Sequence, residues 1–462
     1  MITANLETIR LYTDGELCAA EHAGIECAGV STDTRSIRKG SLFVPLIGER
    51  FNGHAFVGHA LAHGACAALW QRDQGEPPEG ATVVVVDDTL SALQRLAAEY
   101  RRSLPVKVVG ITGSNGKTTT KDMVAAILET THKVQKTSGN FNNHIGLPLT
   151  LLALEPDTEY AVLEMGMRAR GEIELLSAIA QPDIAVITNI GEAHLLHLGS
   201  RDEIARAKLE IVTGMKEDGT VVLPGDEPLI DRYIQEVVGS KRFNAVRFGE
   251  SERCDLSLAQ ASVGSDATSF TLRGSTREYN IPMLGKHNAV NALAAVAVGR
   301  IAGVSEERIA AGLKKLVPTG MRIERVAGRN GTTLWNDAYN ASPSSMRAAL
   351  ELLAAASVPG RKFAVLADML ELGPDEAAYH RAIGETLTPE TIDYVFTYGP
   401  LARYIAEAAA ARYEAGRVEA LDSKQALIRK VEALMGPGDL IMVKGSRGMK
   451  LEETIQSWQA EA

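Results

Sequence analysis

Short apolar runs alternate with amphipathic segments along the whole chain. In the first hundred residues, apolar runs lie at 42–46, 67–70 and 83–86, and helical patterns lie at 55–62 and 90–100. Alternating strand-like and helical segments are typical of α/β domains. The pattern is interrupted at Ser103-Leu104-Pro105, so we predict a first, small α/β domain over residues 1–105.

The same alternation continues in two further parts of the chain. Apolar runs at 106–112, 160–163 and 184–188 lead into helical patterns, as in a mostly parallel sheet covered on both faces. Beyond Pro318-Thr319-Gly320, apolar runs lie at 332–335, 363–366, 394–397 and 440–443, and helical patterns lie at 346–356, 401–411 and 423–434. We therefore predict an α/β protein of three domains, with a central domain over 106–317 and a Rossmann-like C-terminal domain over 318–462. Residues 240–280 are predicted to form a β-rich insertion.

One stretch combines a strand, a glycine-rich turn and a helix in the order that a phosphate-binding loop requires. The run 106–112 leads into Gly-Ser-Asn-Gly-Lys-Thr-Thr, and a helical pattern follows at 121–129. The turn is a variant, because Ile111 stands where the general pattern places its first glycine. Lys117 would reach the β- and γ-phosphates of a nucleotide, and the Thr118 hydroxyl would coordinate Mg²⁺. The predicted nucleotide-binding residues are Gly113, Ser114, Asn115, Gly116, Lys117, Thr118 and Thr119.

Polar residues follow other predicted strands of the central domain. Glu164 comes directly after the run 160–163, and His194 follows the run 184–188. Ligands bind at the carboxyl ends of parallel strands, so Glu164 is a candidate Mg²⁺ ligand or water-positioning group, although a helix cap would also explain it. His194 is equally well explained as a loop histidine. A nearby loop holds amides that would bind a polar substrate or simply form a turn. These amides are Asn140, Asn142 and Asn143.

Further candidates lie at other helix starts and strand ends. Asn288 and Asn291 begin an Ala/Val-rich helical pattern. Their amides would contact adenine next to a nucleotide site, although a well-capped buried helix would also explain them. Lys444 and Arg447 follow the run 440–443 and suit a phosphate or a carboxylate. The remaining polar candidates are Asp337, Tyr339 and Asn340 in the third domain, and Ser31, Asp33, Thr34, Arg35 and Asn52 in two loops of the first. Taken alone, these two loops are more typical of turns and caps than of binding sites.

The composition narrows the class of protein. The chain has 462 residues, of which 45% are hydrophobic and 23% charged, and a formal net charge of −10. These values are ordinary for a soluble protein and argue against general nucleic-acid binding. The four cysteines show no paired spacing, so neither a zinc site nor a disulfide framework is favoured. We find no signal pattern and no apolar stretch of about 20 residues, and we expect a cytoplasmic protein without a membrane span.

Together, these features indicate an enzyme that uses ATP to activate a small molecule. A kinase would transfer the phosphate to a hydroxyl group. A ligase would phosphorylate a carboxylate and let an amine displace the phosphate. Residue chemistry alone leaves both reactions open.

The chain resembles the Mur ligases, ATP-dependent enzymes that form the amide bonds of the peptidoglycan peptide. The resemblance covers nearly the whole chain and is carried by residues 112–119, 140–148, 164–166, 189–200, 287–292, 337–340 and 444–447. Within the family, the chain is most like the members that act on UDP-N-acetylmuramoyl-tripeptide and D-alanyl-D-alanine. The motifs for this are Asp-Thr-Arg at 33–35, Leu-Phe-Val at 42–44, Asp-Ala-Tyr-Asn-Ala-Ser-Pro at 337–343 and Asp-Met-Leu-Glu-Leu-Gly at 368–373. One departure is Ala367, where glycine is expected.

The resemblance implies those two substrates, an acyl-phosphate intermediate, and ATP with two Mg²⁺ ions as cofactors. Thr118 would hold one ion, and Glu164 and His194 would hold or orient the second. Lys208, in a helical pattern over 201–215, matches a lysine that several Mur ligases carry as a carbamate, which would supply a further Mg²⁺ ligand. The implied catalytic residues are Lys117, Glu164, His194, Lys208, Lys444 and Arg447.

The resemblance also assigns the remaining candidates. Asn288 and Asn291 would bind adenine, Asp337 would meet the ribose, and Arg322 would face the nucleotide. Substrate contacts are implied for Ser31, Asp33, Thr34, Arg35, Asn52, Asn140, Asn142, Asn143, Tyr339 and Asn340. We further expect a monomer whose domains are open without ligands and closed around them.

Two alternatives are kept. The ligase of the preceding step typically carries an Asp-Asn/Asp-Pro-Arg motif, which this sequence lacks. A non-catalytic paralogue would keep the fold without turnover, and the intact Lys117, Thr118, Glu164, His194 and Lys444 argue against it. The third residue of the tripeptide, diaminopimelate or lysine, is left open.

Overall fold

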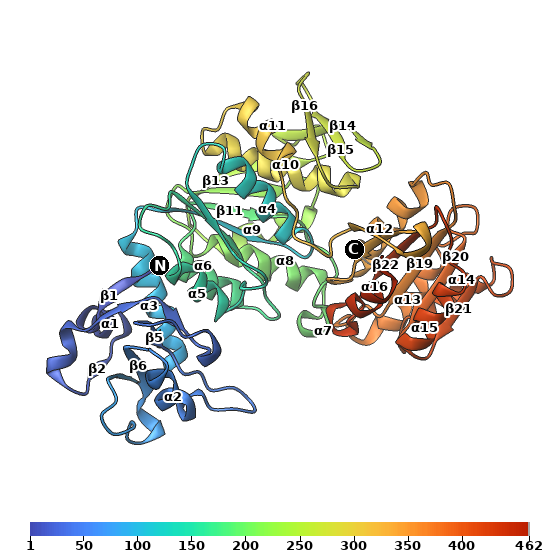
Figure 1. Cartoon of the computed structure of the whole chain (residues 1–462). Helices are drawn as coiled ribbons and strands as arrows, with labels where there is room; N and C mark the ends of the chain where they lie inside the picture. Colours follow the sequence, from blue (N-terminus) through green and yellow to red (C-terminus); the bar gives the residue numbers. More distant parts are fainter. Residues whose placement is uncertain (461–462) are drawn as a thin grey trace.

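The computed structural model describes residues 1–460, whose strands form four sheets in three lobes. Figure 1 shows the lobes in chain order, from the blue N-terminal lobe through the green and yellow central lobe to the orange and red C-terminal lobe. Each lobe combines strands with helices, so the predicted α/β fold class is confirmed. No helix in this part of the chain is long and apolar enough to cross a membrane.

The N-terminal lobe contains two small sheets with helices packed against them. Its elements are β1 Thr3–Asn5, α1 Leu6–Thr13, β2 Glu16–Leu17, β3 Glu26–Ala28, β4 Val30–Ser31, β5 Leu42–Phe43, α2 Val57–Ala62, β6 Ala67–Gln71, β7 Val83–Val86 and α3 Thr89–Ser103. The larger sheet has the order β2-β7-β6-β5-β4, and only β2 runs antiparallel to its neighbour. The apolar run at 42–46 forms a strand over two residues only, and β4 precedes it at the sheet edge.

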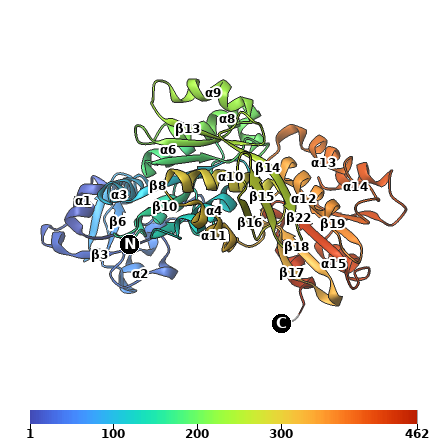
Figure 2. The same cartoon turned by 90° about the horizontal axis from the view of Figure 1, so that it is seen from above.

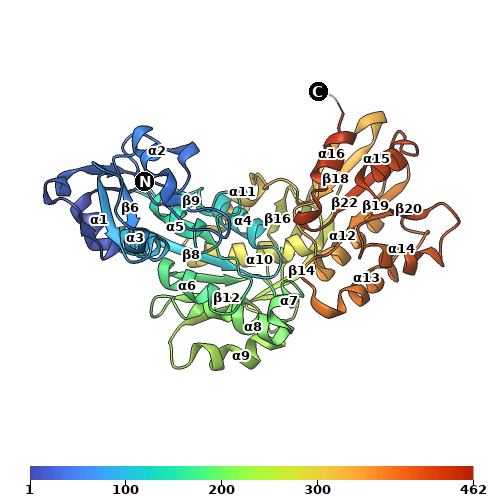
Figure 3. The same cartoon turned by 90° about the horizontal axis from the view of Figure 1, so that it is seen from below.

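The central lobe is built on a nine-stranded sheet. Its strands are β8 Lys107–Thr112, β9 Val134–Lys136, β10 Tyr160–Glu164, β11 Ile184–Ile187, β12 Thr220–Pro224, β13 Asn244–Gly249, β14 Leu256–Val263, β15 Thr268–Leu272 and β16 Glu278–Ile281. Its helices are α4 Lys117–Leu128, α5 Gly146–Leu152, α6 Glu172–Ala180, α7 Leu195–Leu198, α8 Arg201–Leu209, α9 Pro228–Val238, α10 Lys286–Ile301 and α11 Glu306–Lys314. Figures 2 and 3 show α4, α10 and α11 on one face of the sheet and α6, α8 and α9 on the other.

Alternating burial explains how both faces of this sheet are covered. Val109 and Ile111 of β8 belong to the apolar cluster that includes the inner sides of α4 and α10, whereas Val108 belongs to the cluster on the opposite face. Buried parallel strands of this kind carry apolar residues toward both layers of helices. The phosphate loop follows β8, so it lies at the carboxyl edge of the sheet between β10 and β11.

The β-rich stretch at 240–280 is not a separate insertion, and that part of the prediction was wrong. β13 pairs in parallel with β12, and β14 pairs in parallel with β13, so both continue the central sheet. β15 and β16 then extend the same sheet in antiparallel fashion. Sheet pairing depends on tertiary packing as well as on local sequence, so the local pattern does not reveal that these strands continue the central sheet.

The C-terminal lobe holds a six-stranded sheet of order β17-β18-β22-β19-β20-β21, parallel except for β17. Its strands are β17 Glu324–Ala327, β18 Thr333–Asp337, β19 Lys362–Ala367, β20 Tyr394–Tyr398, β21 Val418–Leu421 and β22 Leu440–Lys444. Its helices are α12 Pro343–Ala355, α13 Glu376–Gly384, α14 Arg403–Ala410, α15 Lys424–Glu432 and α16 Glu452–Trp458. One apolar cluster includes α12, α13 and α14, and a second includes α15 and α16, so this sheet is also covered on both faces.

Two helix boundaries differ from the prediction. α4 begins at Lys117 rather than at residue 121, because the threonines that follow Lys117 are buried against the lobe and tertiary contacts override their low helix propensity. The pattern predicted over 201–215 ends as α8 at Leu209 and tightens into a short 3-10 helix, η5 Glu210–Val212.

The N-terminal and central lobes share one apolar core. Leu93 and Leu96 of α3 belong to the same buried cluster as Leu147 and Leu151 of α5. The Tyr100 hydroxyl also donates to the Leu154 carbonyl at 2.8 Å. The N-terminal lobe is therefore packed firmly against the central lobe, which contains the phosphate loop.

Candidate active site

The phosphate loop requires glycine at two positions. Gly113 has φ of +152°, and a Cβ there would lie 1.8 Å from Thr188 Oγ1. Gly116 has φ of +78°, and a Cβ there would lie 2.6 Å from Asn291 Oδ1. The loop thus passes close to β11 on one side and to α10 on the other, as only glycine allows.

Asn189 holds the tip of this loop in place. Its Oδ1 accepts the Asn115 backbone N–H at 3.0 Å, and its Nδ2 donates to the Asn115 carbonyl at 3.0 Å. The Ser114 N–H donates to the Asn189 carbonyl at 3.1 Å. These reciprocal bonds fix the backbone of the loop before any ligand binds.

Lys117 folds back over the loop that it follows. Its Nζ donates to the Gly113 carbonyl at 2.8 Å. Burial lowers the pKa of Lys117, the Glu164 carboxylate opposes this, and the Arg322 guanidinium adds to the lowering. An anion bound at the loop would favour the charged ammonium and so strengthen its own binding.

Glu164 lies beside the phosphate loop. It is the last residue of β10, one position inside the strand that it was predicted to follow, and is only 2% exposed. Its Oε2 accepts the Thr118 hydroxyl at 2.8 Å, and its Oε1 accepts the Asn142 amide at 2.8 Å. The Thr118 hydroxyl in turn accepts Arg322 Nη2 of the C-terminal lobe at 2.8 Å. A buried carboxylate and a hydroxyl of the phosphate loop are thus in direct contact.

His194 and Lys208 add two nitrogen groups close enough to Lys117 to interact with its charge. His194 Nδ1 lies 2.7 Å from Glu371 Oε2 of the C-terminal lobe. Burial, with the positive charges of Lys117 and Lys208, lowers the pKa of His194 to about 4, against the opposing effect of Glu371. Burial, followed by the charge of Lys117, lowers the pKa of Lys208 well below its usual value. Among residues 1–460, the Lys208 amine makes no hydrogen bond or ion pair.

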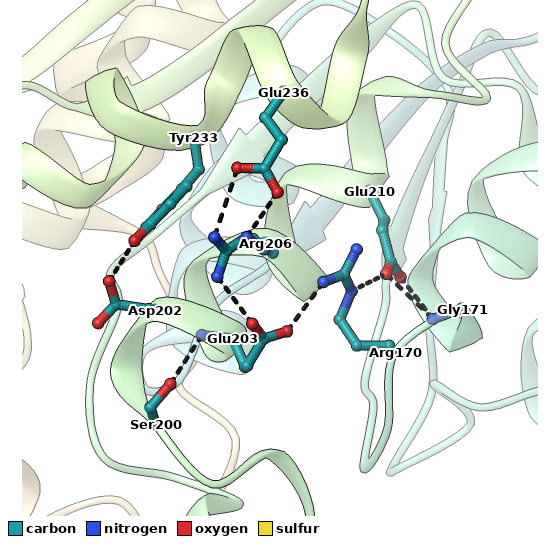
Figure 4. Close-up of polar contacts among 9 residues, drawn as sticks. All are labelled: Arg170, Gly171, Ser200, Asp202, Glu203, Arg206, Glu210, Tyr233 and Glu236. Atoms are coloured by element: carbon teal, nitrogen blue, oxygen red, sulfur yellow. Dashed lines mark hydrogen bonds and ion pairs between the residues drawn. The ribbon is translucent and has the colours of Figure 1, made fainter.

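A network of charged side chains holds the helix that carries Lys208. Figure 4 shows Glu236, Arg206, Glu203, Arg170 and Glu210 alternating in charge across α9, α8 and the start of α6. The contacts from Arg206 to Glu203 and Glu236 measure 2.7 Å, and the contact from Arg170 to Glu210 also measures 2.7 Å. The Glu210 carboxylate further accepts the Gly171 N–H at 2.9 Å, where α6 begins. The network therefore fixes α8 relative to α6 and α9.

Polar residues of α10 and of the C-terminal lobe face the phosphate loop. Asn288 Nδ2 donates to the Leu284 carbonyl at 2.8 Å, and Asn291 Nδ2 lies 3.3 Å from Asn288 Oδ1. Lys444, the last residue of β22, forms an ion pair of 2.6 Å with Asp337 and donates to the Asn340 carbonyl at 3.1 Å. The Arg322 guanidinium lies 4.3 Å from the centre of the Tyr339 ring.

A cleft of about 1040 Å³ lies between the central and C-terminal lobes. Among its lining residues are Ser114, Asn115, Gly116, Lys117, Thr119, Asn140, Asn142, Asn143, Glu164, His194, Asn288, Asn291, Arg322, Asp337, Tyr339, Asn340 and Lys444. The structure thus brings together most of the site residues predicted from the sequence. Gly113, Thr118 and Lys208 lie behind the lining, although Thr118 contacts Glu164 directly. This volume is ample for a nucleotide with part of a second substrate.

Family profiles match three successive parts of the chain. They are described as the Mur ligase family catalytic domain over residues 26–101, the Mur ligase middle domain over 111–299 and the Mur ligase glutamate ligase domain over 321–447. The chain is 48% identical to the UDP-N-acetylmuramoyl-tripeptide–D-alanyl-D-alanine ligase of Bacillus subtilis (strain 168), with 99% of this chain and 98% of that protein covered. The chain belongs to the Mur ligase family.

Solved structures of Mur ligases share the fold over the whole chain. MurF from Acinetobacter baumannii superposes with a TM-score of 0.89 at 31% identity, covering 99% of this chain and 98% of that one. MurF ligase from Thermotoga maritima in complex with ADP gives 0.81 at 28% identity, covering 93% and 96%. The resemblance stated from the motifs is confirmed. Mur ligases form amide bonds with ATP, and the chain is a ligase of this class.

The N-terminal candidates lie outside this Mur ligase cleft. Asp33 forms a 2.6 Å ion pair with Arg35 and caps the short helix that follows it, and this pairing holds the pKa of Asp33 at about 2. Ser31 accepts the Asp33 N–H at 3.2 Å, and Thr34 opens the helix. Asn52 caps another turn through the His54 N–H and donates to Gln74. Each loop is a capped turn, as the sequence alone favoured, with its polar groups partly exposed.

Arg447 is also outside the lining of the cleft. Its guanidinium lies 3.3 Å from Glu452 Oε1 and contacts Met321 Sδ, and its side chain is 55% exposed. Asn143 lines the cleft, but its Oδ1 accepts the Gly146 N–H at the start of α5. Both side chains therefore have structural partners besides any substrate.

Two hydrogen bonds that no local pattern predicted join the phosphate loop to the C-terminal lobe. Asn115 Nδ2 donates to Ser344 Oγ at 3.1 Å, and Asn115 Oδ1 accepts the Ser342 hydroxyl at 3.1 Å. Ser342 caps α12 and is followed by a proline, which is a recognisable helix start. The sequence identifies Ser342 as a helix cap, but only the packing of the two lobes shows that Ser342 faces the phosphate loop.

Proposed function

We propose that this Mur ligase joins D-alanyl-D-alanine to the tripeptide of UDP-N-acetylmuramoyl-tripeptide in an ATP-dependent reaction. The observation that carries the proposal is the cleft in which Lys117 and Glu164 of the central lobe line the same cavity as Lys444 of the C-terminal lobe. The sequence supports the proposal through its 48% identity to a Bacillus subtilis protein named as the ligase for this reaction.

In this proposal, ATP lies along the phosphate loop with its base near α10. Free backbone N–H groups at the start of α4 and the Lys117 ammonium bind the β- and γ-phosphates. Asn288 and Asn291 contact adenine, Asp337 meets the ribose, and Arg322 approaches the phosphates from the C-terminal lobe. The buried setting of these groups makes each charge interaction stronger than it would be in water.

Mg²⁺ fits the oxygen-rich donor set at the loop. Thr118 and Glu164 present a hydroxyl and a buried carboxylate in contact, and oxygen ligands of this kind suit Mg²⁺. Residues 1–460 hold no group of three or more His, Cys, Asp or Glu side chains arranged to hold a metal. That agrees with the usual Mg²⁺ site, which uses one or two carboxylates and completes its shell with phosphate and water. Bound Mg²⁺ would neutralise negative charge on the transferred phosphoryl group.

Lys208 suits modification to a carbamate. Its amine is buried, lacks a partner among the described residues and has a lowered pKa, so the neutral form that reacts with carbon dioxide is favoured. A carbamate would place anionic oxygens near His194, and with that residue it would hold a second Mg²⁺ ion.

The reaction follows from these positions. A carboxylate oxygen of the tripeptide attacks the γ-phosphorus of ATP, the bond to the β-phosphate oxygen breaks, and ADP leaves. The amine of D-alanyl-D-alanine then attacks the acyl carbon, loses a proton, and inorganic phosphate leaves. Lys117 stabilises charge on the phosphoryl group during the first step, and Lys444 is placed to bind the acyl phosphate in the second. Arg447 would bind the dipeptide carboxylate, provided that its side chain turns toward the cleft.

The tripeptide substrate must reach the cleft from the N-terminal lobe. Its UDP-sugar would be bound by the loops of Ser31, Asp33, Thr34, Arg35 and Asn52. Asn140, Asn142, Asn143, Tyr339 and Asn340 would line the path of the peptide to the phosphate loop. The predictions of a monomer and of a cytoplasmic location stay predictions.

Phosphate release from ATP tests this function. We expect release only when UDP-N-acetylmuramoyl-tripeptide and D-alanyl-D-alanine are both present, with a pentapeptide product by mass spectrometry. Release with the dipeptide precursor and a free diamino acid would assign the protein to the preceding step instead. Absence of release with either pair would favour the non-catalytic paralogue.

A further inference from the structure

Glu371 of the C-terminal lobe contacts the site through His194. Glu371 Oε2 lies 2.7 Å from His194 Nδ1, and the Glu371 carbonyl accepts the Leu196 N–H at 2.9 Å. The two residues are 177 positions apart in the chain. One residue of the C-terminal lobe therefore holds both the side chain of His194 and the backbone that follows it.

Both partners adopt a backbone conformation that non-glycine residues rarely use. His194 has φ of +65° and Glu371 has φ of +63°. Such positions cost of order 1 kcal/mol each and persist only where surrounding contacts hold them. Strain of this kind on both sides of one hydrogen bond indicates an arrangement held by the packed lobes rather than a chance approach of two side chains.

The surrounding packing supports this contact. α7, which begins directly after His194, packs against the 3-10 helix η7 Gly373–Asp375 of the C-terminal lobe. Tyr379 of α13 lies against the apolar clusters of both the central and the C-terminal lobe. Figure 1 shows α7 beside the C-terminal lobe. The lobes therefore meet at this point through apolar as well as polar contacts.

We propose that Glu371 is a positioning residue that orients His194 for its role at the phosphate site only while the C-terminal lobe is docked. A carboxylate that accepts the Nδ1–H of an imidazole fixes the tautomer, so that Nε2 carries the free lone pair. His194 then presents Nε2 as an acceptor or ligand on the side away from Glu371. In this proposal, docking of the C-terminal lobe and orientation of His194 therefore occur together. This inference rests on the proposed function for the role of His194, but the contact itself can be tested separately.

The direct test is nitrogen-15 NMR of histidine-labelled protein, with His194 assigned by comparison with His194→Gln. In the wild type we expect His194 protonated at Nδ1. In Glu371→Ala we expect the population to shift toward the Nε2-protonated tautomer. An exposed carboxylate of the same lobe, changed in Glu385→Gln, serves as the matched control and should leave the His194 signals unchanged. An unchanged tautomer in Glu371→Ala overturns the proposal.

Kinetics provide a second, independent readout. Loss of a carboxylate that orients a histidine costs about 10- to 100-fold in activity or metal affinity. We expect Glu371→Ala to lower kcat by that factor and to raise the Mg²⁺ concentration for half-maximal rate, with the KM for UDP-N-acetylmuramoyl-tripeptide little changed. Glu371→Gln keeps an acceptor oxygen and should recover part of the rate. A kcat of Glu371→Ala within twofold of the wild type contradicts the proposal. A wild type without turnover would instead contradict the proposed function, and the NMR test would still decide the contact.

Discussion

At the scale of single residues, basic side chains gather beside the phosphate loop and its buried carboxylate. Lys117, Arg322 and Lys208 lie in or behind the cleft, and Glu164 is the carboxylate in contact with the phosphate loop. Burial lowers the pKa of both Lys117 and Lys208, and a neighbouring positive group adds to the lowering in each case. A site of this kind suits a ligand with several negative charges and a bound metal ion, as ATP with Mg²⁺ is.

Lys117→Ala is expected to remove most of the turnover. The ammonium is the charged group placed over the phosphate loop, and loss of one such transition-state contact costs at least about 10²–10³-fold in kcat. The measurement is phosphate release with both substrates at saturation. Lys133→Ala, which removes a surface lysine paired with Glu155 and Asp157, is the matched control. An unchanged rate of phosphate release in Lys117→Ala would contradict the proposed mechanism.

His380 is expected to make the fold sensitive to mild acid. It is fully buried, its Nε2 accepts the Met369 N–H at 2.9 Å, and its Nδ1 donates to the Glu376 carbonyl at 2.7 Å. Burial lowers the pKa of His380, so the unfolded chain takes up the proton first as the pH falls. The stability is therefore full above about pH 6.5, the usual histidine pKa, and falls below it by up to about 1.4 kcal/mol per pH unit.

Urea unfolding at a series of pH values checks this expectation. His380→Gln should unfold more easily at neutral pH and lose less stability between pH 7 and pH 5 than the wild type. His63→Gln changes an exposed histidine and should keep the wild-type slope. Equal slopes in the wild type and His380→Gln would show that His380 does not titrate in this range.

At the scale of elements, the network in Figure 4 positions α8 and α6. Glu210 has a side chain only 5% exposed and accepts hydrogen bonds from Arg170 and from the Gly171 N–H. Its removal leaves donors at the start of α6 without a partner. We expect Glu210→Ala to lower the free energy of unfolding by about 1–3 kcal/mol.

The same network supplies a control for that change. Glu236 pairs with Arg206 but is 54% exposed, so solvent screens the pair. Glu236→Ala should cost no more than about 1 kcal/mol. Denaturant unfolding of the two variants measures the difference. Equal losses would mean that burial of Glu210 adds nothing to the stability of this region.

Elements could be predicted from the sequence where a short local motif specifies them. The glycine-rich turn after 106–112 and the carboxylate at the end of β10 were both visible, because a phosphate loop and a strand end have local signatures. The pairing of β13 with β12 was not visible, since it depends on which distant strand lies alongside. The contact of Asn115 with Ser344, 229 positions away, was hidden for the same reason.

At the scale of the whole molecule, the cleft exists only because two lobes meet. Arg322 donates to the Thr118 hydroxyl, and the Thr319 hydroxyl donates to the Asp122 carboxylate at 2.7 Å. The segment that leads into the C-terminal lobe therefore contacts α4 at two positions near its start. Lobes that meet around a large cleft commonly move relative to one another. A ligand that binds both lobes would favour their closest approach.

Small-angle scattering should detect this movement. We expect the radius of gyration to fall when a non-hydrolysable ATP analogue and UDP-N-acetylmuramoyl-tripeptide are added together, because the proposed binding residues for these ligands come from all three lobes. Either ligand alone should have a smaller effect. Identical profiles with and without both ligands would count against domain closure.

The central claim is that a carboxylate of the tripeptide attacks ATP at this site. The most direct measurement uses UDP-N-acetylmuramoyl-tripeptide with oxygen-18 in its terminal carboxylate, together with ATP and D-alanyl-D-alanine. If an acyl phosphate forms, each inorganic phosphate released carries one oxygen atom from the carboxylate, and mass spectrometry will show it. Release of unlabelled phosphate would mean that water, rather than the tripeptide, attacks ATP, and would contradict the account.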